Sequence, residues 1–225
     1  MVYANFFRPS VEDVAALVEV ESLAWASPGA NITACQDKLL SRVESHGGSQ
    51  SVVLATIEGK PAGSQYAFRF NWDASVEGLR SWDEYTAEGW TNKVHNPIGS
   101  TGFLVGVGVV PEFRGIKVAH NLRWSGEYKV SELLIAATLD NLFLGGGVQR
   151  VIANARIPFY HKMAQLSVED YCGLRREDGK LFDPVLRFHE RMGATIIKPV
   201  VYSMEDAESL NGGCWVLYHR PFENA

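Results

Sequence analysis

The segment 103–119 constrains the fold of this chain more than any other stretch. Residues 103–110 read FLVGVGVV, carry no charge and are rich in valine, which is typical of a strand that is buried on both faces. Pro111 cannot donate a backbone hydrogen bond, so we expect the strand to end there. Arg114 and Gly115 then lead into a helix that is expected from Ile116 onward. The segment is therefore predicted to fold as strand, turn and helix.

The turn in this segment has the chemistry of a phosphate site. The first backbone N–H groups of a helix have no partner within the helix and lie at the positive end of its dipole, so they bind anions. Arg114, Lys117 and Arg123 add positive charge nearby. We therefore predict a cradle for a phosphate or pyrophosphate group; the alternative is an ordinary turn after a buried strand.

Residues 107–119 also form a known pattern, V-x-V-x-P-x-x-R-G-x-x-x-A, followed by Leu122. It resembles the acyl-CoA-binding motif of the GCN5-related N-acetyltransferase (GNAT) superfamily. The resemblance implies that the strand backbone pairs with the pantetheine of CoA and that the turn holds the pyrophosphate. Lys117 departs from the family, which usually has a glycine there, because a lysine takes a positive φ only at a cost. The cofactor-binding residues implied are Val107, Val109, Arg114, Gly115, Ile116, Lys117 and Ala119.

The same resemblance implies a fold for the whole chain. It predicts the α/β (α+β) GNAT fold, which is a single mixed, mostly antiparallel sheet with a splayed central strand pair and flanking helices. A chain of 225 residues can bury a substantial core, so we expect one domain over residues 1–225. Its 46% hydrophobic and 21% charged residues are ordinary for a globular protein.

The net charge and the cysteines argue against several kinds of binding partner and site. A net charge of -5 argues against a nucleic-acid-binding surface. The three cysteines, Cys35, Cys172 and Cys214, have no ligand-type spacing, so we expect a reducing compartment and no metal site. No apolar run is long enough to span a membrane, and residues 1–7 lack the features of a signal peptide. The protein is therefore expected to be cytoplasmic, without a membrane partner.

The first half of the chain is predicted to supply two helices and a hairpin. Ser10 has the features of an N-cap for a helix that ends near Trp25, before the proline and glycine of residues 27–29. A second helix is expected over residues 33–44, ending before Gly47 and Gly48. Residues 51–57 and 64–70 are predicted to be the two strands of a hairpin.

Residues 71–100 form an insertion relative to a minimal acetyltransferase. Trp72, Trp82, Tyr85 and Trp90 stand there among polar residues. The insertion is either a packed surface excursion or a lid over the reactive end of CoA. We favour the lid, because loops of this length inside a compact domain tend to be functional.

The second half is predicted to complete the sheet. The helical pattern from Ile116 to the glycines near residue 146 is longer than one helix needs, which predicts a break. A buried strand follows at residues 150–155, and by resemblance it splays away from the motif strand. A short helix is expected at residues 168–176 and another at 184–192, with Asp183 as N-cap and Gly193 as the stop. Residues 194–202 and 214–219 are the last expected strands.

Two further segments narrow the resemblance: R-x-P-x-x-H at residues 156–161, and DPVLRFHERMGA at residues 183–194. Together with SWDE at 81–84 and HNP at 95–97, they resemble the acetyltransferase-like domains attached to some carbon–nitrogen hydrolases. They also resemble the starter-unit domains of certain polyketide synthases, which are regarded as GNAT-like decarboxylases of malonyl-type CoA thioesters. An acyl carrier protein is the partner implied, and the resemblance leaves open whether it delivers or receives the acyl group.

This resemblance implies a set of site residues. His161 matches the central histidine that follows the splayed strand, with a structural role as the alternative. Trp25, which is otherwise a core residue, and Arg176 would line the substrate pocket, and Arg175 is the alternative to Arg176. Tyr160, beside His161, is included in the pocket. A hydroxyl partner for the histidine would come from Ser100 or Thr101, and we assign Thr101.

The position of acidic side chains near the motif helps to distinguish between two possible reactions. Acetylation of an amine needs a group to accept the ammonium proton, and residues 103–111 contain no acid. Decarboxylation needs instead a desolvated carboxylate and donors aimed at the thioester oxygen. The lack of an acid favours decarboxylation, and Glu112 and Glu127 remain the alternative candidates for the base of an acetyltransferase.

These features lead to three hypotheses about function. The first is an acyl-CoA decarboxylase that converts malonyl-CoA or an α-methylated malonyl-CoA to a short acyl starter thioester in polyketide biosynthesis. The second is an N-acetyltransferase of a small amine. The third is a non-catalytic acyl-CoA-binding module.

Overall fold

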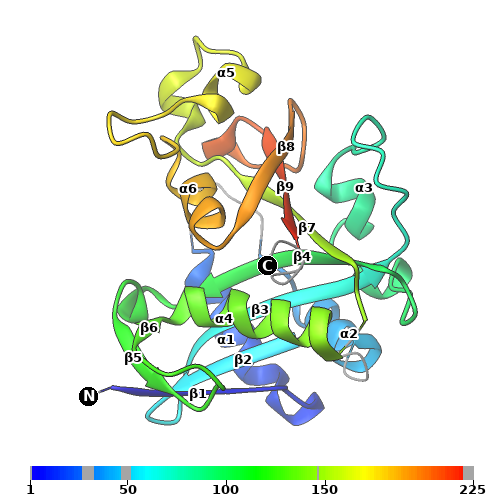
Figure 1. Ribbon diagram of the computed structural model, residues 1–225. Helices are drawn as coiled ribbons and strands as arrows, with labels where there is room; N and C mark the ends of the chain where they lie inside the picture. The colour runs from blue at the N-terminus through cyan, green and yellow to red at the C-terminus, as the bar shows by residue number, and fades with distance from the viewer. Residues whose placement is uncertain (1, 27–32, 47–51, 146, 220–225) are drawn as a thin grey trace.

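One mixed sheet forms the frame of the protein (Figure 1). The computed structural model describes residues 2–26, 33–46, 52–145 and 147–219. Within them, nine strands lie in the order β6-β5-β1-β2-β3-β4-β7-β9-β8. Only the pairs β1–β5 and β4–β7 are parallel, so the predicted mixed, mostly antiparallel sheet is confirmed. The strands are β1 Tyr3–Phe7, β2 Val52–Ile57, β3 Lys60–Phe70, β4 Thr101–Val109, β5 Lys117–His120, β6 Tyr128–Lys129, β7 Arg150–Arg156, β8 Ala194–Val200 and β9 Gly213–His219.

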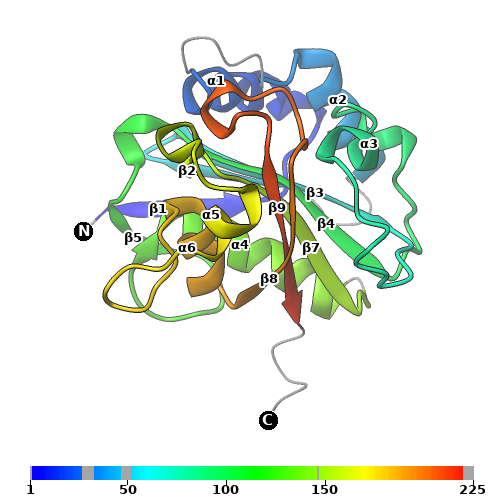
Figure 2. The same ribbon diagram turned by 90° about the horizontal axis from the view of Figure 1, so that it is seen from above.

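Helices cover both faces of this sheet. The side chains of β2 alternate, so that Leu54 packs with α1 and α2 while Val53 and Ala55 pack with α4 on the opposite face. Figures 1 and 2 show α1 and α2 on one side of the strands and α4 on the other. The helices are α1 Val14–Ala24, α2 Gln36–His46, α3 Trp82–Thr86, α4 Val130–Asp140, α5 Val168–Gly173 and α6 Pro184–Arg191. None of the helices in the described ranges is long and apolar enough to cross a membrane.

The predicted ends of α1 and α6 are confirmed by their capping contacts. The helix predicted at residues 33–44 instead spans Gln36–His46, and the helix predicted at residues 168–176 ends at Gly173. Ser10 caps a short 3₁₀ turn that continues into α1, and α1 ends at Trp25. Asp183 accepts hydrogen bonds from two backbone N–H groups of α6, and Gly193 follows that helix with a φ of +85°. The predicted breaks at residues 27–29 and at 47 and 48, and the predicted strand start at residue 51, lie outside the described residues.

The helix predicted from Ile116 is wrong. Residues Lys117–His120 form β5 instead, which pairs with β1 and β6, and α4 begins only at Val130. The physical reason is long-range pairing: the Ala119 N–H donates to the carbonyl of Val2 at 2.9 Å, and the Val118 side chain is fully buried. Because β1 itself had no clear signal in the sequence, the strand that β5 joins was not predicted.

Candidate functional site

The central feature of the site is a gap between two parallel strands. β4 and β7 pair only from Thr101 to Leu104 and from Arg150 to Ala153. Beyond these residues the described parts of β4 and β7 form no further pairs with each other, so β7 does not cover the edge of β4 from Val105 onward. The predicted splay of these strands is therefore confirmed.

A β-bulge lies at the point where the two strands part. Tyr66 of β3 is opposite Gly106 and Ala67 is opposite Leu104, which leaves Val105 as the extra residue. Trp82, from the insertion 71–100, donates its indole N–H to the carbonyl of Val105 at 3.1 Å. The insertion thus satisfies a backbone group that the bulge frees, and it forms one wall of the site.

A cleft with a volume of about 760 Å³ opens from this gap. β4 separates its two sides, because Gly106 and Gly108 face α1 whereas Val107 and Val109 face α4. A Cβ on Gly108 would lie 3.1 Å from the Cβ of Ala24, and one on Gly106 would lie 3.9 Å from the Trp25 ring. The glycines therefore let the end of α1 pack close to β4, and they place Trp25 in the wall of the cleft.

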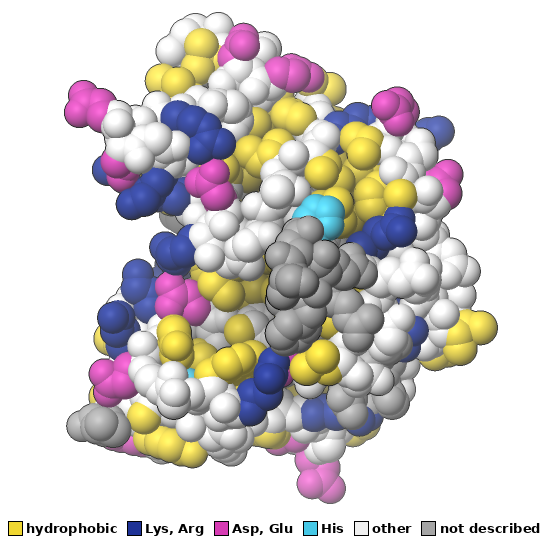
Figure 3. All heavy atoms as spheres, viewed as in Figure 1, with side chains coloured by type: hydrophobic (Ala, Val, Ile, Leu, Met, Phe, Trp, Pro, Cys, Tyr) yellow, Lys and Arg dark blue, Asp and Glu magenta, His cyan; other side chains and the backbone are white. Residues whose placement is uncertain are grey.

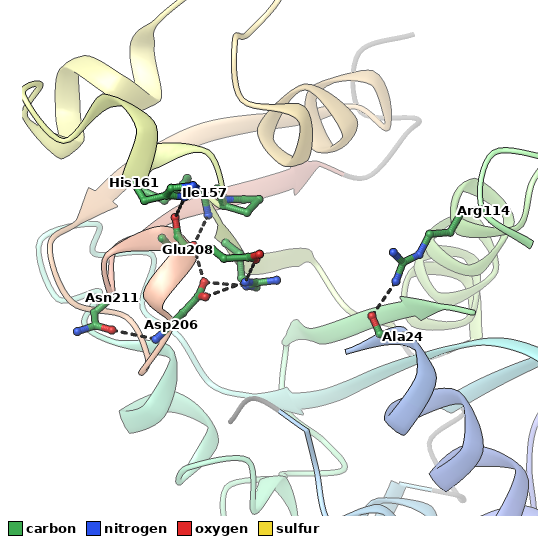
Figure 4. Close-up of polar contacts among 10 residues, drawn as sticks. Ala24, Arg114, Ile157, His161, Asp206, Glu208 and Asn211 are labelled. Carbon is green, nitrogen blue, oxygen red and sulfur yellow. Dashed lines mark hydrogen bonds and ion pairs between the residues drawn. The ribbon is translucent and has the colours of Figure 1, made fainter. Parts of the chain in front are cut away.

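The turn after β4 holds part of the predicted cradle. The Arg114 guanidinium donates to the carbonyl of Val109 at 2.9 Å and to that of Ala24 at 2.7 Å, which joins the turn to the C-terminal end of α1 (Figure 4). Gly115 has a φ of +80°, and a Cβ there would have nothing within 4 Å, so its backbone is open to a ligand. Arg114 and Gly115 line the cleft, as do Val107 and Val109.

The other cradle residues lie elsewhere. Ile116, Lys117 and Ala119 are not among the residues that line the cleft. Lys117 lies in β5 without a positive φ, so the departure from glycine there causes no strain. The N-terminal turn of α4 reaches the cleft through Ser131 instead.

An ion-pair cluster lies at the end of β7, where Arg156 faces the cleft. Its guanidinium contacts Asp206 through two hydrogen bonds of 2.7 Å and Glu208 through one of 2.8 Å (Figure 4). Burial alone would raise the pKa of Asp206, but hydrogen bonds from Arg156 and Ser209 lower it below its usual range. Arg156 also lies 5.9 Å from the centre of the Trp25 ring.

His161 supports this cluster from outside the cleft. Its Nδ1 lies 2.8 Å from the carbonyl oxygen of Pro158 and 2.9 Å from that of Glu208. Both partners are acceptors, so Nδ1 carries the proton. The side chain is exposed, and His161 is not among the residues that line the cleft. Its contacts tie the end of β7 to the loop that carries the acidic partners of Arg156.

Three other predicted site residues lie away from the cleft. Tyr160 is in the core and donates its hydroxyl to the carbonyl of Leu166. Thr101 is fully buried at the closed end of the β4–β7 pair. Arg176 is exposed and lies 3.8 Å from the carboxylate of Asp178. Arg175 pairs with Glu190 of α6. Figure 3 shows basic and acidic side chains close together on the part of the surface where α5 and α6 lie.

Sequence reasoning missed a group of polar residues on the α1 side of the cleft. Arg42 of α2 is buried, donates to the carbonyl of Gly89 at 3.0 Å and stacks on Tyr66 at 5.0 Å. Glu21 of α1 is also buried, and burial raises its pKa. We call this group the polar lobe; it consists of Glu21, Lys38, Arg42, Tyr66, Asp83, Glu88 and Glu205. A charged residue on an apolar helix face, such as Arg42 between Leu39 and Val43, was the available signal.

Metal-binding groups and disulfides do not occur in the parts of the chain that the structure describes. No three histidine, cysteine, aspartate or glutamate side chains among these residues are arranged to hold a metal ion. Cys35 is exposed, Cys172 and Cys214 are buried, and all three have free thiols.

Solved structures similar to this chain are GNAT domains. The loading GNATL domain of CurA from Lyngbya majuscula is 23% identical, with a TM-score of 0.78 over 96% of this chain and 98% of that one. The GphF GNAT-like decarboxylase in complex with isobutyryl-CoA is 25% identical, with a TM-score of 0.73 over 95% of this chain and 98% of that one.

Two proteins of Bacillus subtilis are similar in sequence, and no protein-family model matches the chain. The uncharacterized N-acetyltransferase YkwB is 28% identical over 79% of this chain and 71% of its own length. The probable hydrolase YhcX is 28% identical over 64% of this chain, which spans only 25% of that protein.

Proposed function

Because the chain has the fold of the GCN5-related N-acetyltransferases, we propose that it binds an acyl-CoA in the cleft between β4 and β7. The edge of β4 that β7 leaves uncovered runs from Val105 to Val109 and is about 13 Å long at the usual rise of a strand, and the amides of pantetheine would pair with backbone groups between these two residues. The pyrophosphate would lie between Gly115 and the N-terminus of α4 at Ser131. The thioester then reaches the bulge, where the strands part.

We further propose that the protein decarboxylates malonyl-type CoA thioesters. The observation that carries this proposal is the similarity over nearly the whole chain to a GNAT-like decarboxylase that binds isobutyryl-CoA. An acyl group of that kind is what remains when an α-dimethylated malonyl thioester loses CO₂. The product would be a starter thioester, and an acyl carrier protein is its proposed recipient.

The reaction places specific demands on the cleft. The bond between the α-carbon and the carboxylate breaks, its electrons form an enolate whose charge lies on the thioester oxygen, and the α-carbon then takes a proton. The aromatic side chains of Trp25, Tyr66 and Trp82 would exclude water from the carboxylate, which favours loss of CO₂. His161 is proposed to act on this site through the loop of Asp206 and Glu208.

One observation favours acyl transfer to an amine as a second candidate. Four carboxylates of the polar lobe line the cleft, and burial raises the pKa of two of them, Glu21 and Asp83. A carboxylate with a raised pKa is better matched to accept the proton of an ammonium group near neutral pH. The lobe would also attract a cationic acceptor.

Mass spectrometry of CoA thioesters separates these candidates. The protein would be incubated with malonyl-, methylmalonyl- and dimethylmalonyl-CoA, without any second substrate. We expect at least one to become the acyl-CoA that is lighter by one CO₂, with CoA still attached. If all three stay intact while acetyl-CoA releases free thiol with a panel of amines, the acyltransferase is correct. If CoA binds and neither reaction occurs, the protein is a binding module.

A further inference from the structure

We infer that the side-chain amide of Asn154 donates a hydrogen bond to the thioester oxygen of the bound acyl-CoA and stabilises the charge that develops there. This inference rests on the proposed binding of an acyl-CoA. It concerns a residue for which the sequence suggested no role, and it applies to decarboxylation and to acyl transfer alike, because both reactions place negative charge on that oxygen.

The amide of Asn154 is held in a fixed orientation. The side chain is only 7% exposed, and its Oδ1 accepts a hydrogen bond of 2.7 Å from the hydroxyl of Ser203. Gly213, on the neighbouring strand β9, leaves the space for this contact, since a Cβ there would lie 2.4 Å from Oδ1 and 2.8 Å from the Cβ of Ser203. With Oδ1 committed to Ser203, the donor face of the amide is fixed as well.

The donor of this amide has no protein partner. Nδ2 of Asn154 is buried and makes no hydrogen bond in the structure. A buried donor without an acceptor is destabilising, so it is rare unless a ligand supplies the acceptor. Asn154 is among the residues that line the cleft, and the cleft is therefore where such an acceptor would enter.

The position of Asn154 matches the reactive end of the cleft. It is the first residue of β7 beyond the last pair with β4, directly across the gap from the bulge at Val105. Its partner on β9 is Trp215, whose side chain packs on the α1 face, so Asn154 lies on the face that carries Trp25. An acyl-CoA whose arm follows β4 from Gly115 toward the bulge brings its thioester to this point.

A comparison of two ligands in one protein tests this contact directly. The ligands are isobutyryl-CoA and its thioether analogue, in which a methylene group replaces the carbonyl. Wild-type protein should bind the thioester more tightly than the thioether by about twofold to tenfold, as one hydrogen bond allows. In Asn154→Ala the two affinities should become equal. Because each ratio is measured within one protein, a general loss of stability in the variant does not affect it.

Infrared spectroscopy supplies a readout that does not depend on turnover. With a ¹³C label in the thioester carbonyl, bound isobutyryl-CoA should show a lower carbonyl stretching frequency in wild type than in Asn154→Ala. Asn154→Asp keeps the shape of the side chain and should also abolish the shift. Ser203→Ala frees the amide to rotate and should give an intermediate frequency. Turnover in Asn154→Ala should fall by about 10²–10³.

The outcomes separate the two levels of the proposal. If wild-type protein binds neither isobutyryl-CoA nor acetyl-CoA, the proposed function is wrong. If it binds, but wild type and Asn154→Ala show the same carbonyl frequency and the same preference for the thioester, then Asn154 does not contact the oxygen and only the present inference is overturned.

Discussion

Lowering the pH from 7.5 to 5 should destabilise the protein through one buried side chain in the wall of the cleft, His189 of α6. Burial lowers the pKa of His189 from an ordinary value of 6.5 to about 4. Its Nδ1 lies 2.6 Å from the hydroxyl of Tyr218, whose own pKa is raised by burial, so the tyrosine donates and the imidazole is neutral. Protonation of His189 is therefore opposed in the folded protein.

The size of the effect follows from the two pKa values. The unfolded chain binds a proton on this histidine below about pH 6.5, whereas the folded protein does so only near pH 4. The stabilisation is thus complete above pH 6.5 and is lost as the pH falls toward 4. Between pH 7.5 and pH 5 the loss is about 2 kcal/mol, and it approaches roughly 3 kcal/mol below pH 4.

Urea unfolding of wild type and His189→Gln at pH 7.5 and pH 5 measures how much stability is lost through protonation of His189. The variant will have its own stability at pH 7.5, but its further loss at pH 5 should be smaller than that of wild type by about 2 kcal/mol. His219→Gln, which removes an exposed histidine, serves as the matched control and should keep the pH dependence of wild type. If wild type and His189→Gln lose the same stability between the two pH values, the account of His189 as a buried neutral group is refuted.

Three further predictions concern the cleft and the cluster of Arg156. Gly106→Val should leave CoA binding near wild type and weaken isobutyryl-CoA binding by about tenfold or more, because the added side chain would fill space beside the Trp25 ring that the acyl group is proposed to occupy, and overpacking costs roughly 1–3 kcal/mol. Calorimetric titration measures both affinities, and equal losses would contradict the placement of the acyl group. His161→Ala should lower turnover by about 10²-fold, because it loosens the loop that holds the acidic partners of Arg156 and so misplaces groups of the site. His161→Asn, which retains a donor near the Nδ1 position, should keep most of the turnover, and an equal loss in both variants would instead make the imidazole catalytic. Asp206→Asn should lower the free energy of unfolding by about 3 kcal/mol, measured with urea, because it breaks a buried ion pair. The exposed control Asp178→Asn should be as stable as wild type, and equal stability of the two variants would contradict a stabilising role of the Asp206–Arg156 pair.

Local chemistry in the sequence was enough to predict much of the fold. The apolar run that forms β4 ends at Pro111 as expected, and the caps of α1 and α6 follow from Ser10, Asp183 and Gly193. Each of these features depends on a residue and its near neighbours in the chain. They are therefore visible without knowledge of what packs against them.

The predictions that were wrong depend instead on contacts between distant parts of the chain. Ala119 lies in a stretch that looks helical, but its backbone pairs with Tyr3 of β1, more than a hundred residues earlier in the chain. No local sequence pattern shows that these two short strands pair, because short strands depend on long-range contacts. For the same reason, the predicted start of the helix at Ile116 was wrong, and the helix end that lies at the cleft is that of α4 at Val130.

The candidate site shows the same limit. The spacing R-x-P-x-x-H places His161 just after β7, but the loop that its ring contacts comes 47 residues later in the chain. Asn154 has no local signal beyond being a polar residue in an apolar strand. Its unpaired donor became visible only when Ser203 and Gly213 were in place around it.

The most direct test of the central claim is to run the reaction in D₂O. Decarboxylation through an enolate requires the α-carbon to take a proton from solvent. We predict that a malonyl-type CoA thioester yields an acyl-CoA that has lost CO₂, has kept its bond to CoA and carries one deuterium on its α-carbon where the product formed in H₂O carries hydrogen. A thioester that is recovered intact, or one that releases free CoA without loss of CO₂, would contradict the proposal.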